Sequence, residues 1–141
     1  MLECYSLLAA LAARTEKIEL SSLVTGNTYR NPTVLAKTIT TLDVISKGRA
    51  VLGIGAGWFQ LEHDALGFEF GTFTDRFEKL EEALQIIIPM INGEKTSFEG
   101  KNVICVPVSF DLPFTFSDDF AFPLLNSIKY LYQRQTTKTL L

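Results

Sequence analysis

Residues 18–31, IELSSLVTGNTYRN, and residues 51–58, VLGIGAGW, decide the fold of this chain. Each stretch begins with β-forming apolar residues and ends in small residues, which predicts two strands that each run into a tight turn. In α/β sheets, ligands bind at the carboxyl ends of the strands. Because both turns lack bulky side chains, their backbone amides are free to approach a phosphate or a flat ring closely.

Composition narrows the class of protein. With 141 residues and 47% hydrophobic content, the chain has the length of one ordinary domain and enough apolar material for a packed core. The 13 basic and 16 acidic residues give a net charge of -3 with no basic block, so we expect no nucleic-acid partner. The apolar N-terminus carries Glu3 where a signal peptide needs positive charge, and it is too short to span a bilayer. We therefore expect a cytoplasmic protein with no membrane partner, and the two strand-end turns favour a small molecule as its ligand.

Hydrophobic periodicity predicts the first half of the chain. Residues 3–14 have helical spacing, and residues 18–25 form a buried strand in which Ser21 and Ser22 mark a bulge. Asn31 as N-cap and Pro32 open a helix that Lys47-Gly48 ends. Its expected buried face is Leu35, Ile39, Leu42 and either Ile45 or Ser46. Residues 49–54 are a continuous apolar run, typical of a parallel strand buried on both faces.

The second half begins with a weakly helical stretch to Leu66 and a loop over residues 67–74. A capping-box-like start at Asp75 and Glu78 then opens an amphipathic helix that ends at Asn92-Gly93. From about residue 103 the texture changes, which divides the chain into a domain of residues 1–102 and a divergent tail of residues 103–141. Within the tail, residues 110–116 alternate like an edge strand and residues 126–133 suggest a short helix.

Few residue patterns suggest chemistry. Gly53-x-Gly55-x-Gly57 follows a strand, but the dinucleotide fingerprint needs a glycine three places after the second one, and Trp58 follows Gly57 directly. A tight turn and a phosphate or flavin contact in another parallel-sheet fold both remain open. One histidine cannot build a usual metal site, so we expect no bound metal and place His63 on a helix surface, with a catalytic base as the alternative.

Polar groups follow the first strand at Thr25, Asn27 and Tyr29. A barrel would place its ligand there, but Gly-Asn is also a common turn dipeptide, and spacing alone does not separate the two interpretations. Near the last predicted helix, Arg76 is either part of a solvated face or the partner of an acidic group that fixes the preceding loop.

Four ordered blocks of sequence resemble the luciferase-like monooxygenase family. They are LVTGNTYRNP at residues 23–32, DVISKGR at 43–49, LGIGAGW at 52–58 and RFEKLEEAL at 76–84. The spacing between the blocks also fits, and the resemblance runs from about Leu2 to Lys101.

The resemblance implies a (β/α)8 TIM barrel that binds FMN or the deazaflavin coenzyme F-420 at its C-terminal face. By this similarity Leu23, Val24 and Thr25 correspond to a bulged strand behind the flavin ring, with a cis peptide bond between Leu23 and Val24. The implied cofactor-binding set also includes Gly55, Ala56, Gly57 and Trp58 beside the cofactor and Asn27 near the ring or the substrate mouth. The resemblance leaves the catalytic residues unassigned.

A closed barrel of this kind needs about 250 residues. We therefore expect an incomplete barrel segment with parallel strands and flanking helices, from a flavin- or deazaflavin-dependent oxidoreductase, and a fragment without a complete active site. The alternative is a non-catalytic α/β fragment or assembly partner that binds no cofactor. Because an open parallel edge favours pairing with another chain, a homo-oligomer is a further expectation.

Overall fold

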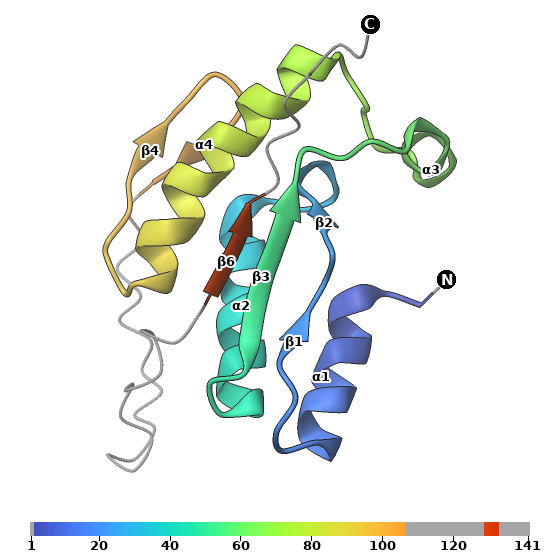
Figure 1. Ribbon diagram of the computed structural model, residues 1–141. Helices are drawn as coiled ribbons and strands as arrows, with labels where there is room; N and C mark the ends of the chain where they lie inside the picture. Colours follow the sequence, from blue (N-terminus) through green and yellow to red (C-terminus); the bar gives the residue numbers. More distant parts are fainter. Residues whose placement is uncertain (1, 107–128, 133–141) are drawn as a thin grey trace, which may run out of the picture.

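A computed structural model describes residues 2–106 and 129–132, and the expected edge strand at residues 110–116 lies outside these ranges. Figure 1 shows the helices and strands of the described chain. In order they are α1 (Cys4–Arg14), β1 (Leu20–Ser21), β2 (Thr25–Gly26), the short 3-10 turn η1 (Asn27–Tyr29), α2 (Pro32–Ser46), β3 (Ala50–Gly55), α3 (Gln60–Leu66), α4 (Phe73–Ile91), β4 (Phe98–Glu99), β5 (Ile104–Cys105) and β6 (Lys129–Tyr132).

Strand β3 is the centre of a parallel sheet. It pairs with β1 near its start and with β2 near its end, while β6 pairs with it over four residues from Val51 to Ile54. Since residues of β3 pair with β6 and also with β1 or β2, the β6 strand must lie along the other edge of β3. The short helix expected over residues 126–133 is therefore wrong for residues 129–132, because β3 offers these residues a free row of backbone groups and local propensity yields to that pairing.

The register of the sheet contains the bulge that Ser21 and Ser22 predicted. Ser21 pairs with Val51 and Thr25 pairs with Ile54, so four residue steps on one strand face three on the other. The additional residue interrupts the pairing with β3 in the segment that separates β1 from β2, and it bends the chain there. The single strand expected over residues 18–25 is thus two short strands with a bulge between them.

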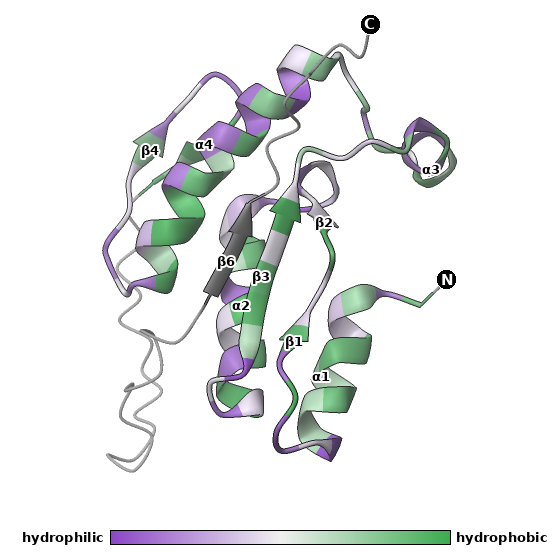
Figure 2. Cartoon of the chain, viewed as in Figure 1, coloured by the Kyte–Doolittle hydropathy of each residue, from purple (hydrophilic) through white to green (hydrophobic). Residues whose placement is uncertain are grey.

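The core lies between β3 and the helices on one side of the sheet. Helix α2 packs against α1, α4 and β3, and Figure 2 shows hydrophobic and hydrophilic residues on different faces of α4. All six residues of β3 are buried, as the continuous apolar run predicted. Fully buried large apolar side chains from these elements are Leu35, Ile39, Leu52, Ile54, Leu80, Ile86, Ile87 and Ile91. Of the two alternatives at the end of the α2 face, Ser46 is buried and Ile45 is 41% exposed.

The helix boundaries follow local side-chain chemistry. Asn31 caps α2 by accepting a hydrogen bond from the Thr33 amide at 2.9 Å, as expected. The predicted start of α4 is wrong by three residues, because Thr72 is the N-cap and Asp75 is the third helical residue of a full capping box. Periodicity does not show that Thr72 is the N-cap, because threonine is common both in loops and at helix N-caps.

Arg49 fastens the end of α1 to the turn after α2. Its guanidinium donates to the backbone oxygens of Ala12 and Thr15 at 3.0 and 2.8 Å, and to those of Ile18 and Ser46 at 2.7 Å each. Carbonyls at a helix C-terminus lack partners within the helix, so a cation there satisfies them and complements the helix dipole. The contacts fix the amino ends of β1 and β3 relative to each other.

Two absences concern the described residues alone. In residues 2–106 and 129–132, no helix has the length and apolar character required to cross a bilayer. The same residues contain no cluster of three or more histidine, cysteine, aspartate or glutamate side chains suited to a metal ion.

Candidate functional site

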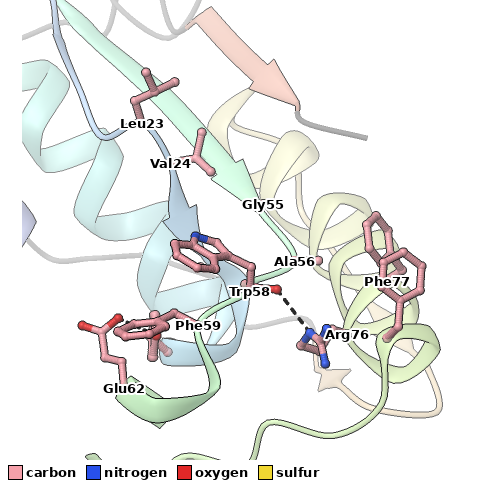
Figure 3. A pocket seen from close by; sticks show the side chains of 13 residues that line it. Leu23, Val24, Gly55, Ala56, Trp58, Phe59, Glu62, Arg76 and Phe77 are labelled. Carbon is pink, nitrogen blue, oxygen red and sulfur yellow. Dashed lines mark hydrogen bonds between the residues drawn. The ribbon is translucent and has the colours of Figure 1, made fainter. Parts of the chain in front are cut away.

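A cleft of about 390 Å³ opens where β2 and β3 end, at the carboxyl edge of the sheet. Figure 3 shows side chains from the bulge, the turn after β3, α3 and α4 around it. The structure brings six of the eight predicted site residues together in its wall, namely Leu23, Val24, Gly55, Ala56, Gly57 and Trp58. Its other lining residues are Gly26, Tyr29, Phe59, Glu62, Phe73, Arg76 and Phe77.

The bulge forms one wall of this cleft. The peptide bond between Leu23 and Val24 is cis, as the family resemblance implied. Glycine at two positions of β3 leaves room for the bulge: a Cβ on Gly53 would lie 2.1 Å from the carbonyl oxygen of Ser22, and one on Gly55 would lie 3.0 Å from Val24 Cγ2. The side chain of Leu23 is 91% exposed and covers no other part of the described chain.

The turn after β3 forms the opposite wall. Gly57 has a φ of 82°, a left-handed conformation that favours glycine, and a Cβ there would lie 3.0 Å from Thr28 Oγ1. Ala56 is buried, whereas Trp58 is 77% exposed beside the ring of Phe59. The exposed indole beside the Phe59 ring gives the cleft mouth a flat apolar surface that water solvates poorly.

His63 holds α3 against η1. The surface position expected for it is wrong, because its side chain is fully buried. Its Nδ1 lies 2.8 Å from the Phe59 carbonyl oxygen, to which it donates, and its Nε2 lies 2.6 Å from Thr28 Oγ1, so both ring nitrogens have hydrogen-bond partners. The ring also stacks at 4.4 Å on Tyr29. The sequence of α3 does not show this burial, because His63 packs on Thr28 and Tyr29 of η1 and not on the sheet.

Tyr29 and Glu62 form a polar pair in the cleft wall. The Tyr29 hydroxyl donates to Glu62 Oε2 at 2.8 Å. Burial, together with the hydrogen bond to the Glu62 carboxylate and its charge, raises the pKa of Tyr29 to about 12. The phenol therefore stays protonated at neutral pH and keeps Glu62 oriented as an acceptor toward the cleft.

Arg76 supplies the cation of the site. Its guanidinium donates to two backbone oxygens, from Nε to Gly57 at 3.2 Å and from Nη1 to Gly71 at 3.0 Å, and it lies 3.8 Å over the Phe70 ring. Figure 3 shows it extending from α4 toward the turn after β3. It fixes the loop before α4 through carbonyl oxygens, where the sequence suggested an acidic partner.

Two predicted site residues lie outside the cleft wall. Thr25 is buried, with its hydroxyl 2.7 Å from that of Tyr5 and 2.9 Å from that of Ser22. Asn27 is also buried, and it lines a neighbouring pocket between η1 and α4. Its Oδ1 has no hydrogen-bond partner among the described residues. The assignment of all eight residues to a cofactor stays a prediction.

The cleft suits a flat ring that carries an anionic tail. Its volume falls within the range of small-molecule sites, about 300 to 1,000 Å³. Leu23, Val24 and Trp58 offer apolar surface, Gly55 and Gly57 keep the backbone accessible, and Arg76 offers positive charge. No local sequence pattern indicates the contribution of Glu62 or Phe59, since the residues of a short helix and of its N-cap enter a site through tertiary packing.

Comparison with known proteins identifies a family. The model described as luciferase-like monooxygenase matches residues 1–113. An F-420-dependent glucose-6-phosphate dehydrogenase of Microbacterium testaceum is 40% identical over 94 residues, which cover 66% of this chain and 28% of that protein. The protein of the same name from Nocardia farcinica is 36% identical over 110 residues, covering 75% and 32%. The chain thus spans about a third of the length of the curated relatives it matches.

Solved structures share the fold. The coenzyme F-420-dependent tetrahydromethanopterin reductase of Methanopyrus kandleri superposes with a TM-score of 0.67 at 27% identity, over 75% of this chain and 33% of that one. The oxygenating constituent of 3,6-diketocamphane monooxygenase from the CAM plasmid of Pseudomonas putida, in complex with FMN, gives 0.65 at 27% identity, over 73% and 28%. These neighbours are TIM-barrel enzymes, and the described part of this chain is an incomplete segment of such a barrel.

Proposed function

The chain belongs to the luciferase-like monooxygenase family, and from this premise we propose that its cleft holds FMN or coenzyme F-420 for an oxidoreductase reaction on a small molecule. The observation that carries the proposal is the meeting of the bulge at Leu23–Val24 with the turn at Gly55–Trp58. The bulge comes just before β2 and the turn just after β3, so both lie close to the carboxyl ends of two adjacent parallel strands, which is where α/β folds bind ligands. Named relatives depend on coenzyme F-420 or contain FMN, which supports this choice of cofactors.

Different residues of the cleft are suited to the ring of the cofactor and to its polar groups. Leu23 and Trp58 are positioned to contact the flat face of the ring, because they are the most exposed apolar side chains of the cleft wall, and Val24 lines the cleft beside Leu23. Glu62 and Arg76 are positioned to orient polar groups of cofactor or substrate. When bound, the cofactor supplies the hydride transfer or the reaction with oxygen, and the protein supplies binding and orientation.

The described elements line a cleft at the carboxyl edge of an incomplete barrel sheet, and we propose that the chain contributes part of an active site. Two of the eight candidate residues, Thr25 and Asn27, then act beside the cleft. Thr25 supports the bulge through its hydroxyl contacts. The unpartnered Oδ1 of Asn27 is a buried acceptor that a ligand group reaching η1 is able to satisfy.

A binding titration tests the proposal. The purified chain is titrated with oxidised and reduced FMN and with coenzyme F-420, following cofactor fluorescence and the thermal unfolding midpoint. Saturable binding and a midpoint that rises with cofactor concentration are expected. The variant Gly55→Val should weaken binding at least tenfold, because its Cβ would start 3.0 Å from Val24 and its methyl groups would enter the cleft wall.

Glu16→Gln is the matched control, since Glu16 is exposed and precedes β1 at the opposite end of the strand. It should bind as the wild type does. A folded wild-type chain that binds neither cofactor would contradict the proposal and favour the other candidate, a non-catalytic assembly partner. The observation in favour of that candidate is the exposure of Leu23 and Trp58, which a partner chain would cover as well as a ring does.

A further inference from the structure

We propose that a second pocket, between η1, α4 and the β4–β5 hairpin, binds a small carboxylate that also carries hydroxyl groups, such as a sugar acid. Residues from all three elements line this pocket, which we call the Asn27 pocket, among them Asn27, Thr28, Arg30, Lys79 and Asn102. No described residue lines both this pocket and the cleft of the proposed function. The inference therefore goes beyond the proposed function and does not depend on cofactor binding.

The Asn27 pocket has the size and the fixed walls of a small-molecule site. Its volume of about 370 Å³ falls within the usual range of about 300 to 1,000 Å³. Figure 1 shows β4 beside α4, and Glu82 of α4 accepts hydrogen bonds from the amides of Asn102 and Val103 at 2.9 and 3.1 Å. Because these bonds hold the hairpin in place, a ligand does not have to order this wall when it binds.

An unpaired acceptor is the first sign of a ligand. Asn27 is 6% exposed, and its Oδ1 is buried with no hydrogen-bond partner among the described residues. Buried polar groups almost always have a partner, because an unpaired one has lost its hydration without compensation. A ligand hydroxyl supplies the donor that Oδ1 lacks. Since Asn27 lines the pocket, we expect its carboxamide to turn about the Cβ–Cγ bond and present Oδ1 to that hydroxyl.

The charge of the lining is the second sign. Arg30 and Lys79 are the described cations of the pocket wall, and Glu69 is the described carboxylate. Lys79 pairs with Glu69 at 2.9 Å, whereas Arg30 pairs with Glu3, which does not line the pocket. Surface ion pairs of this kind are weak, and the Glu69 side chain is 79% exposed, so a ligand anion is able to share or replace these partners.

The excess of one positive charge favours a carboxylate over a phosphate monoester. A carboxylate carries a single negative charge at neutral pH, whereas a phosphate monoester carries about 1.5 to 2. The hydroxyl that Asn27 requires and the carboxylate that the two cations attract then belong to the same ligand. A hydroxylated carboxylate combines these two features.

Three probe ligands separate the two features. Isothermal titration calorimetry measures the binding of D-gluconate, which has both, of D-glucitol, which has the hydroxyls without the charge, and of hexanoate, which has the charge without the hydroxyls. Gluconate should bind the wild-type chain at least about fivefold more tightly than either of the other two, because it alone satisfies both the acceptor and the cations.

Two variants remove one feature each. Asn27→Leu should weaken gluconate binding by about 3- to 10-fold and abolish the preference for gluconate over hexanoate. Because it also removes an unpaired buried acceptor, the unfolding midpoint of the ligand-free chain should not fall, whereas a merely structural Asn27 would make it fall. Lys79→Gln should weaken gluconate binding by a similar factor and reduce the preference for gluconate over glucitol.

Lys101→Gln is the matched control. Lys101 also pairs with a glutamate of α4, at 2.8 Å from Glu78, but it does not line the pocket. This variant should bind gluconate as the wild type does. If Asn27→Leu fails to fold, amide chemical shifts of the wild type locate the ligand: gluconate should shift residues 27–30 and 102–104, and not residues 55–58.

Three results would overturn the proposal. Gluconate might fail to bind, or bind no more tightly than glucitol or hexanoate, which would exclude a combined site. Unchanged gluconate binding in both Asn27→Leu and Lys79→Gln would exclude this pocket. Shift changes confined to residues 55–58 would place gluconate in the cleft instead. None of these results affects cofactor binding, which the titration with FMN and coenzyme F-420 measures separately.

Discussion

A single methyl group on Gly53 should destabilise the chain, because the bulge leaves no room for it. An ideal Cβ at this position lies 2.1 Å from the Ser22 carbonyl oxygen, and contacts below 3.0 Å essentially never occur for a real Cβ. The atom in the way is backbone, so β3 and the bulge must separate by roughly 1 Å, which overpacking data place at about 1 to 3 kcal/mol.

Gly55→Ala is the comparison that isolates this contact. Its Cβ would lie 3.0 Å from a methyl group of Val24, and a side chain moves by a few tenths of an ångström at little cost. Alanine also gains about 0.5 to 1 kcal/mol over glycine inside a strand. We therefore expect Gly55→Ala to stay within about 0.5 kcal/mol of wild type, and Gly53→Ala to be less stable by about 1 to 2 kcal/mol.

Urea unfolding followed by circular dichroism measures both variants, with the free energy of unfolding taken by linear extrapolation. Both variants carry the same chemical change two residues apart in one buried strand, so their difference reports the local contact. Equal stabilities, or a more stable Gly53→Ala, would refute the seating of the bulge against Gly53.

Three further predictions concern other contacts. Arg49→Met should lower the free energy of unfolding by about 2 to 4 kcal/mol, because it leaves the α1 carbonyls without their donor; a urea midpoint equal to that of wild type would contradict this. The folded pKa of Tyr29, about 12, lies above its ordinary value of 10.0, so the native protein keeps a proton that the unfolded chain releases, and stability should fall as pH rises from 10 to 12. Tyr29→Phe should remove that part of the pH dependence in thermal unfolding, and an unchanged profile would count against the Glu62 contact. Burial raises the pKa of Asp43, with the Ala50 amide opposing the shift, so stability should fall as pH rises above 3.8; Asp43→Asn should flatten the profile in that range, and a steeper profile would exclude this cause.

The fold was predictable where one local signal sufficed. Asn31 and Pro32 determine where α2 begins, and the unbroken apolar run in β3 requires a strand buried on both faces. The family resemblance added the cis bond at Leu23–Val24, which no local pattern predicts. It also led to six residues that meet in one cleft.

The errors arose where tertiary contacts outweigh local sequence. His63 has polar neighbours in the sequence, as a surface residue has, but Thr28 and Tyr29 from η1 and the Phe70 ring pack against it in the folded chain. Residues 129–132 have weak helical character, and pairing with β3 makes them a strand. Glu62 and Arg76 join the cleft from α3 and α4, whose placement depends on the loops between them.

The glycines of β3 illustrate how a motif can have a meaning other than its usual one. Gly53-x-Gly55-x-Gly57 resembles a dinucleotide fingerprint, whose glycines admit a pyrophosphate and a helix. Here Gly53 admits the Ser22 carbonyl, Gly55 admits Val24, and Gly57 takes a positive φ beside Thr28. Gly53 and Gly55 therefore leave the space that the bulge occupies, and the bulge in turn forms one wall of the cleft. The spacing of two between Gly53 and Gly55 follows from the strand, since alternate residues of β3 face the same side and there meet Ser22 and Val24 of the bulge.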